Sequence, residues 1–124
     1  MVCCFLKREL RLNLRNTLVQ EVEALGELPA LSSLDLWGTR VRDLRHIGTL
    51  SALQVLNLRG TRVQDVRPLS ALTALQSLDL TDTEVGDVRP LICLEALNSL
   101  DLRGIKPLGV DALRRPGLMI IGGD

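Results

Sequence analysis

The sequence repeats itself every 22 residues over most of its length. Thr39, Thr61 and Thr83 are separated by this interval, and residues 31–52, 53–74 and 75–96 each follow the pattern L-x-x-L-x-L-x-x-T-x-V-x-D-(L/V)-x-x-(I/L)-x-x-L. A unit this short cannot bury its own apolar side chains, so it must stack against copies of itself. The repeat therefore predicts a solenoid in which each unit forms one coil.

When the first Leu of each unit is numbered position 1, positions 1, 4 and 6 are leucine in four units. These residues are Leu31, Leu34, Leu36, Leu53, Leu56, Leu58, Leu75, Leu78, Leu80, Leu97, Leu100 and Leu102. The alternation from position 4 to position 6 predicts a short strand with both leucines pointing inward. Strands displaced by one coil pair in parallel about 4.8 Å apart. Together with an earlier unit, the repeats predict a five-stranded parallel sheet.

A turn is expected after each strand. Gly38 and Gly60 lack the Cβ that would restrict the bend out of the strand, and the Thr hydroxyl after each is expected to satisfy buried loop amides. The Asp at position 13 is predicted to be the N-cap of a helical turn, with proline in the first turn of two units. These residues are Asp43, Asp65, Asp87, Pro68 and Pro90. The short repeat leaves room only for single turns, in part 3₁₀.

The repeats divide residues 1–124 as a single domain. We expect an N-terminal cover over residues 1–8, repeats over 9–30, 31–52, 53–74 and 75–96, and a degenerate repeat over 97–117. In the degenerate repeat, Ile105 and Gly109 replace the Thr and the Asp. Residues 118–124 are expected to form a C-terminal strand and tail.

These residues resemble the leucine-rich repeats of the short, 22-residue class, as in internalin-like and phosphatase-regulator-like arrays, with Thr where those usually carry Asn. The resemblance covers about residues 9–113. It implies an α/β solenoid that forms a right-handed arc, with one parallel sheet on the concave face and short 3₁₀ or helical turns on the convex face. It also implies that protein ligands bind the concave face. The adhesion role of secreted internalins is not carried over, because the sequence shows neither secretion nor their dedicated caps.

Positions 3, 5 and 7 are expected to point outward on the concave face. The candidate partner-binding residues there are Arg15, Asp35, Trp37, Val55, Asn57, Arg59, Asp79, Asp101 and Arg103. Trp37 is the predicted anchor and the arginines are the predicted bidentate donors, because Trp and Arg dominate interface hot spots. The alternative is that Asp79 and Asp101 only pair with Arg59 and Arg103 across adjacent strands. Exposed pairs of that kind contribute about 0–1 kcal/mol.

Composition argues against several other classes of partner. The chain has 15 basic and 15 acidic side chains and a net charge of zero, which disfavours nucleic acid or an anionic membrane as the main partner. One Trp, one Phe and no Tyr give no base-stacking platform. The three cysteines have no disulfide spacing, so we expect a cytoplasmic protein. Cys3 and Cys4 fit an N-terminal cover strand better than lipid attachment.

No catalytic or cofactor-binding group is predicted. His46 is the single histidine, and no nucleophile or second metal ligand is placed beside it. Asp79 and Asp101 should be neighbours, but two carboxylates make a weak cation site. The convex Arg45, Arg67 and Arg89, with Arg40 and Arg62 nearby, are interpreted as a solvated face balanced by aspartates, with docking of an acidic partner on the outside of the arc as the alternative.

We therefore predict a non-enzymatic module that binds a protein or peptide on the concave face. One alternative is a structural unit that self-associates into homo-oligomers through open solenoid edges, which are prone to pairing. The other is the recognition part of a larger receptor or ligase complex.

Overall fold

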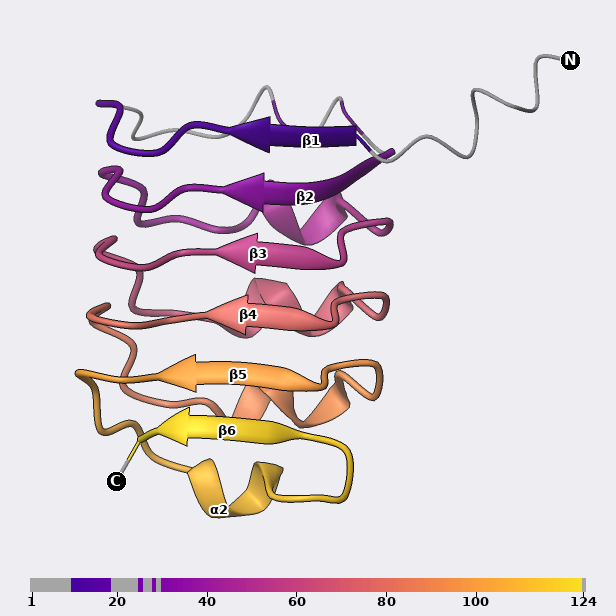
Figure 1. Cartoon of the computed structure of the whole chain (residues 1–124), viewed down its shortest axis with the longest axis vertical. Helices are drawn as coiled ribbons and strands as arrows, with labels where there is room; N and C mark the ends of the chain where they lie inside the picture. Colours follow the sequence, from indigo (N-terminus) through magenta and orange to yellow (C-terminus); the bar gives the residue numbers. More distant parts are fainter. Residues whose placement is uncertain (1–9, 19–24, 26–27, 29, 124) are drawn as a thin grey trace, which may run out of the picture.

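A single sheet of six parallel strands forms one wall of the molecule in the computed structural model (Figure 1), which describes residues 10–18, 25, 28 and 30–123. The strands are β1 (Leu10–Asn13), β2 (Leu31–Asp35), β3 (Val55–Asn57), β4 (Ser77–Asp79), β5 (Ser99–Leu102) and β6 (Met119–Gly122). Their order in the sheet follows the sequence, so each coil lies beside the next. The expected cover strand at residues 1–8, with Cys3 and Cys4, lies outside the described residues.

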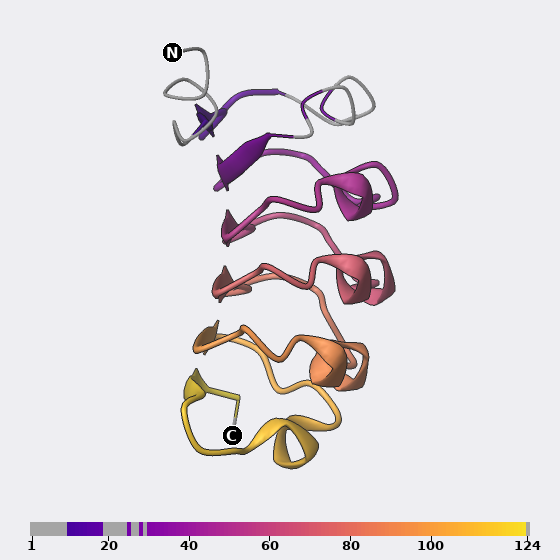
Figure 2. The same cartoon turned by 90° about the vertical axis from the view of Figure 1, so that its right-hand side faces the viewer.

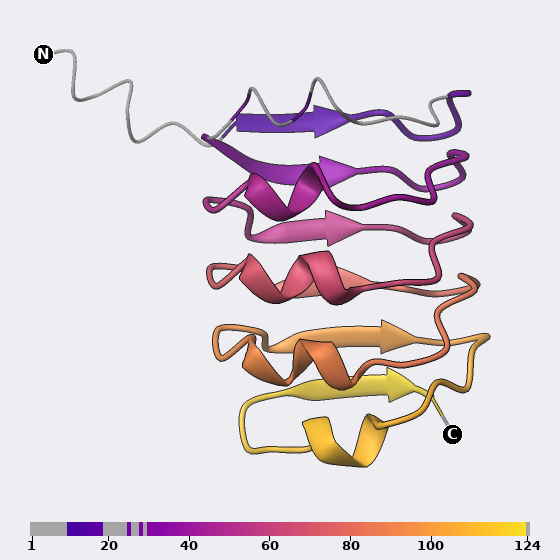
Figure 3. The ribbon, with the colours of Figure 1, turned by 180° about the vertical axis from the view of Figure 1, so that it is seen from behind.

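Short helical turns form the opposite wall of the stack (Figure 2), as the repeat length predicts. The turns are η2 (Ile47–Thr49), η3 (Arg67–Ala71), η4 (Arg89–Cys93) and α2 (Val110–Leu113), of which the first three are 3₁₀ helices. Pro68 and Pro90 occupy the first turns of η3 and η4, where no intrahelical N–H is needed. Seen from behind, these turns form a column parallel to the sheet (Figure 3).

The pairing register of the strands follows the repeat period. Leu34 pairs with Leu56, Leu56 with Leu78 and Leu78 with Leu100, each one repeat apart. The next pair is Leu100 with Ile120, so the degenerate unit is two residues shorter than the others. With β6 the sheet has six strands, one more than the five that the repeats predict. Strand β6 forms within the run expected to be a terminal strand.

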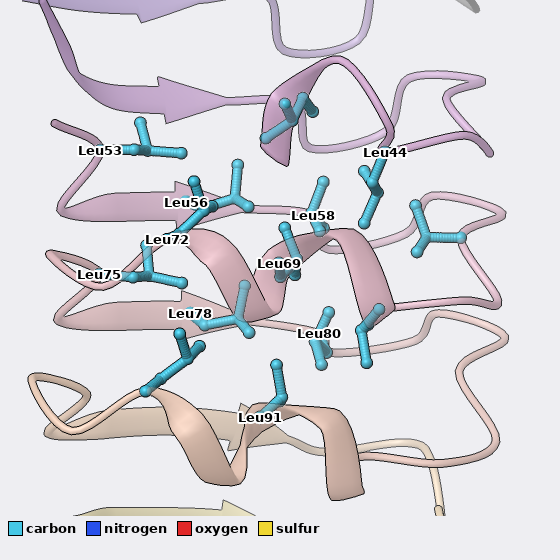
Figure 4. Packing of buried hydrophobic residues seen from close by; sticks show 14 of the residues in the cluster. Leu44, Leu53, Leu56, Leu58, Leu69, Leu72, Leu75, Leu78, Leu80 and Leu91 are labelled. Carbon is cyan, nitrogen blue, oxygen red and sulfur yellow. The ribbon is translucent and has the colours of Figure 1, made fainter. Parts of the chain in front are cut away.

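The core lies between the two walls and consists of the inward leucines and valines (Figure 4). Leu34, Leu56 and Leu78 are at most 1% exposed, which confirms that the leucines of the strand point inward. Leu44, Leu69 and Leu91 close the space from the side of the turns. Each coil thus buries its apolar side chains only against its neighbours, as expected of a solenoid.

The turns after the strands differ from the sequence prediction in their hydrogen bonding. Gly38 and Gly60 have φ of +74° and +71°, as the predicted bend requires. The Thr39 and Thr61 hydroxyls, however, donate to the carbonyl oxygens three residues earlier, at 2.7 Å in both cases, rather than accepting from loop amides. Thr83 does the same at 2.8 Å. The hydroxyl therefore fastens the turn to the end of its own strand.

The aspartates of position 13 are not N-caps in the strict sense. The N-cap residues of η3 and η4 are Val66 and Val88, and neither makes a side-chain cap bond. Instead, Asp65 Oδ1 accepts from the backbone N–H of Arg67, the first residue of η3, at 2.9 Å. The carboxylate thus satisfies an amide of the first turn, as predicted, but from one position earlier in the chain.

Candidate functional site

The residues predicted to bind a partner all lie on the open face of the sheet, opposite the leucine core. We call this surface the sheet face. Strand pairing aligns them in columns, because Asp35 lies beside Asn57, Asn57 beside Asp79, and Asp79 beside Asp101. Position 3 forms a second column, in which Val55 lies between Ser33 and Ser77. The columns run along the long axis of the stack (Figure 1).

The column at position 5 has a structural role that the sequence analysis missed. In each coil the Oδ1 atom of this residue accepts from the backbone N–H two residues later, at 2.9 to 3.1 Å. The residues are Asn13, Asp35, Asn57, Asp79 and Asp101. Such Asx turns offer the backbone an alternative to the strand ladder, and here each lies where a strand ends. For a partner this leaves the amide nitrogen of the asparagines and Oδ2 of Asp79, because Oδ2 of Asp35 and of Asp101 accepts from an arginine.

Trp37 is held between two arginines of neighbouring coils. The guanidinium carbon of Arg15, one coil earlier, lies 4.4 Å from the centroid of the indole ring, and that of Arg59, one coil later, lies 4.6 Å from it. Both distances are within the range of cation–π attraction. The three residues form a stack along the position 7 column, which we call the Arg–Trp–Arg stack. A partner would meet the edge of the ring and the outer sides of the two guanidinium groups.

The charged residues around the stack do not form the ion pairs of the alternative interpretation, in which Asp79 and Asp101 pair with arginines across adjacent strands. Arg15 does bridge strands, since its Nη2 lies 2.7 Å from Asp35 Oδ2. Arg103 instead pairs with Asp101 of its own strand at 2.6 Å. Among the described residues, the Arg59 guanidinium has no ion pair, because it stacks on Trp37 and does not reach Asp79. The proposed pairing of Asp79 with Arg59 is therefore wrong.

Hydrogen bonds from Arg103 dominate the electrostatics of the C-terminal part of the sheet face. They hold the pKa of Asp101 below its usual value and raise the pKa of Arg103. Both groups are therefore charged at neutral pH and largely satisfy each other. Thr81, which is uncharged and buried, lies between Arg59 and Arg103 in the position 7 column. Arg59, which has no ion pair among the described residues, is therefore the guanidinium group that we expect to be most available to a partner on the sheet face.

Apolar groups on the sheet face extend further than the sequence analysis predicted. Val55 is 42% exposed, as an outward position on β3 should be. On β6, Met119 is 65% exposed and Ile121 is 38% exposed, and they pair in register with Ser99 and Asp101. The shortened last unit hid this register, because a strict 22-residue count does not align β6 with β5.

The wall opposite the sheet carries a repeated ion pair. Arg45, Arg67 and Arg89 each lie 2.7 Å from the aspartate two residues earlier, at Asp43, Asp65 and Asp87. Side-chain hydrogen bonds from the arginines lower the pKa of all three carboxyls, and that of Asp87 falls from 3.8 to about 2. These three arginines are thus balanced within their own coils, as the solvated-face interpretation expects.

These pairs predict an acid-dependent loss of stability. The lowered pKa of Asp87 means that the unfolded chain binds more protons than the folded chain between about pH 4 and pH 2. The contribution of the pair to the free energy of unfolding is therefore complete above this window and lost as the pH falls through it. Urea unfolding of the wild type and of Asp87→Asn, which keeps an acceptor for the Arg89 amide, should give curves that converge towards pH 2. A difference that stays constant from pH 7 to pH 2 would contradict this assignment.

Neither a metal centre nor a membrane-spanning helix is found in the described parts of the chain. Within residues 10–18 and 30–123 no three His, Cys, Asp or Glu side chains gather as metal ligands would. Asp79 and Asp101 are neighbours, but the Oδ1 atom of each is already bonded to a backbone amide. Over the same ranges, no helix has the length and apolar character to cross a membrane.

Comparison with known proteins agrees with this geometry. Residues 51–93 match a family model described as leucine-rich repeats in two copies. No curated protein sequence matches the chain.

The fold is similar to that of several solved structures. An internalin from Listeria monocytogenes has a TM-score of 0.85 and 24% identity, over 94% of this chain and 35% of that one. Internalin C2 of the same species has a TM-score of 0.66 and 25% identity, over 90% of this chain and 59% of that one. The ectodomain of the receptor kinase SOBIR1 from Arabidopsis thaliana gives 0.68 and 23%, over 94% of this chain and 68% of that one. The chain thus spans less than two thirds of either internalin.

Proposed function

We propose that this leucine-rich-repeat solenoid is a non-enzymatic module that binds a protein or peptide on its sheet face. Leucine-rich repeats are in general protein-interaction modules, and the site and the partner are our proposal. The observation that carries it is the Arg–Trp–Arg stack. It places a large aromatic ring and two guanidinium groups, the residue types that dominate interface hot spots, within one small area.

The stack is preorganised for binding. Arg15 is fixed at two points, by the Trp37 ring and by the Asp35 carboxylate. The backbone around Trp37 is fixed too, since its N–H is bonded to Asp35 Oδ1. A surface that is ordered before binding loses less side-chain freedom on association, so more of the contact energy appears as affinity.

The chemistry of the site favours a partner that presents an acceptor beside an apolar side chain. Arg59 can offer the outer N–H groups of its guanidinium to a carboxylate or carbonyl, since no ion pair holds it among the described residues. The edge of Trp37 supplies apolar contact beside Arg59, Val55 lies further back on the same coil, and Asn57 has an amide for a main-chain group. Asp79, Asp101 and Arg103 would lie at the C-terminal rim of the contact.

Removing the indole ring tests this proposal. The wild-type chain would be used to capture partners from a cell extract, and Kd would be measured for the strongest one against wild type, Trp37→Ala and Arg89→Gln. We expect Trp37→Ala to weaken binding by at least about 30-fold, because a hot-spot truncation costs about 2 kcal/mol or more. Arg89→Gln changes a paired arginine on the opposite wall and should leave Kd unchanged. Equal Kd values for wild type and Trp37→Ala would refute the assignment of the site.

A second candidate function is self-association through β6. Among the described strands, β6 pairs only with β5, and it carries the exposed Met119 and Ile121. An edge strand with exposed apolar side chains is a template for pairing with another chain. Light scattering over a concentration series, with Ile121→Lys as the matched variant, tests this. A molecular mass that stays at one chain up to the highest concentration would rule it out.

A further inference from the structure

Three arginines gather on the loops that lead from the strands to the helical turns. Arg40 and Arg42 belong to the loop after β2, and Arg62 belongs to the equivalent loop after β3, one coil later. The backbone N–H of Arg62 donates to the carbonyl oxygen of Val41 at 3.3 Å. Arg62 therefore lies beside the residue between Arg40 and Arg42, and all three side chains are exposed.

These arginines are not paired with the carboxylates near them. Arg40, Arg42 and Arg62 make no ion pair with the described residues, whereas Arg45 and Arg67 on the same loops are paired with Asp43 and Asp65. Glu84 occupies the position of Arg62 in the following coil, but its Oε1 accepts from Gln64 Nε2 at 3.1 Å. Residues 40–45 and 62–67 contain five arginines and two aspartates, a net charge of +3 in a chain whose total is zero.

The surface between the two loops is hollowed. Arg42 and Arg62 line this hollow together with Gln64, Pro68, the buried Leu44, Arg45 and the paired Asp43 and Asp65. It therefore offers two guanidinium groups without ion pairs, one amide and the ring of Pro68. The loops lie between the strand ends and the helical turns (Figure 3), so this surface is separate from the sheet face. We call it the basic groove.

We propose that the basic groove binds an acidic peptide segment of a protein partner. Spaced glutamate or aspartate side chains would each accept a bidentate pair of hydrogen bonds from Arg42 and Arg62, the geometry that guanidinium and carboxylate groups share. Their aliphatic parts would lie on Pro68. Arg40 adds attraction at the rim.

The groove suits a peptide better than a nucleic acid. Asp43 and Asp65 lie within it, and a continuous phosphate backbone would be repelled by these carboxylates. The single Trp of the chain lies at position 37 on the sheet face, so no aromatic side chain of the described residues is available there to stack a base. An acidic peptide can instead place its charges at Arg42 and Arg62 and its neutral residues elsewhere.

Labelled octapeptides test the proposal directly. Fluorescence anisotropy would give Kd for an eight-residue glutamate peptide, in which two spaced glutamates stand among glycines and serines, and for a glutamine peptide with glutamine at the same two places. We expect the glutamate peptide to bind the wild type at least tenfold more tightly than the glutamine peptide, with an affinity that falls as salt is added. The double variant Arg42→Gln/Arg62→Gln should weaken glutamate binding at least tenfold, while its circular dichroism spectrum and melting temperature stay at the wild-type values.

Two control variants keep this test apart from that of the sheet face. Arg89→Gln removes one charge from a paired arginine in the next coil and should leave peptide affinity nearly unchanged. Trp37→Ala should have no effect on the glutamate peptide even if it abolishes partner capture. Equal affinity for the two peptides would overturn the proposal, and so would an unchanged Kd for Arg42→Gln/Arg62→Gln. Tighter binding of an oligouridine than of the glutamate peptide would overturn it in favour of nucleic acid.

Discussion

Replacing Leu56 with alanine is expected to lower the free energy of unfolding by about 2–5 kcal/mol. Leu56 is 1% exposed and lies in the sheet between Leu34 and Leu78. The loss has two parts, the transfer free energy of the deleted groups and the cavity that they leave. Coils above and below hold the site open, so the cavity should collapse little and the value should lie in the upper half of the range. Urea unfolding followed by circular dichroism measures it.

The neighbouring residue of the same strand provides the control. Val55 points to the sheet face and is 42% exposed, so Val55→Ala should cost less than about 1 kcal/mol. The contrast between adjacent residues follows from the alternation of side chains along a strand. Similar losses for the two variants would mean that the strand does not separate core from surface in this way.

The second large loss of stability is expected at Gly48, in the wall of helical turns opposite the sheet. An ideal Cβ at Gly48 would lie 2.6 Å from the carbonyl oxygen of Pro68 in the following coil. Backbone cannot rotate away as a side chain can, so Gly48→Ala should force the coils apart there. We expect a loss of about 1–3 kcal/mol, typical of overpacking in a closely packed region.

Gly86→Ala is the matched variant for this prediction. No atom lies within 4 Å of an ideal Cβ at Gly86, and its φ is outside the left-handed region. Alanine there restricts only the unfolded chain, so it should leave the stability unchanged or raise it by about 0.4–1 kcal/mol. If Gly48→Ala is as stable as Gly86→Ala in urea, the close approach of η2 and η3 is not present in solution.

The repeat allowed most of the fold to be predicted, because one position of the pattern has one environment in every coil. The inward leucines and the parallel register follow from period two within a unit and from the spacing between units. Two features do not follow. The role of Gly48 depends on the distance between coils, which no single unit encodes, and the shortened last unit moves β6 out of the strict count.

Hydrogen-bond direction was the part of the turns that the sequence left ambiguous. A threonine hydroxyl both donates and accepts, so the position of Thr39 in the pattern does not tell which it does. The aspartates of position 13 all accept from the backbone N–H two residues later. For Asp65 and Asp87 this is the first amide of a helical turn, as predicted, but η2 begins only at Ile47, so the amide bonded to Asp43 lies before its turn.

The sequence allowed us to predict which residues of the candidate site are neighbours, but not which of them bond to one another. Register alone places Arg15, Trp37 and Arg59 in one column. Whether Arg59 pairs with Asp79 or stacks on Trp37 depends on its side-chain conformation, which register does not determine. Within the basic groove, the repeat pattern did not predict Arg42, because it has no equivalent in the next coil, where Gln64 takes its position.

The central claim is that equivalent outward side chains of successive coils lie next to one another. Proton NMR tests it directly at the Arg–Trp–Arg stack, since Trp37 is the single Trp of the chain. Side-chain protons of Arg15 and Arg59 held over the indole faces should be shifted upfield by the ring current and should return to ordinary values in Trp37→Ala. Identical shifts for these protons in the wild type and in Trp37→Ala would contradict the claim.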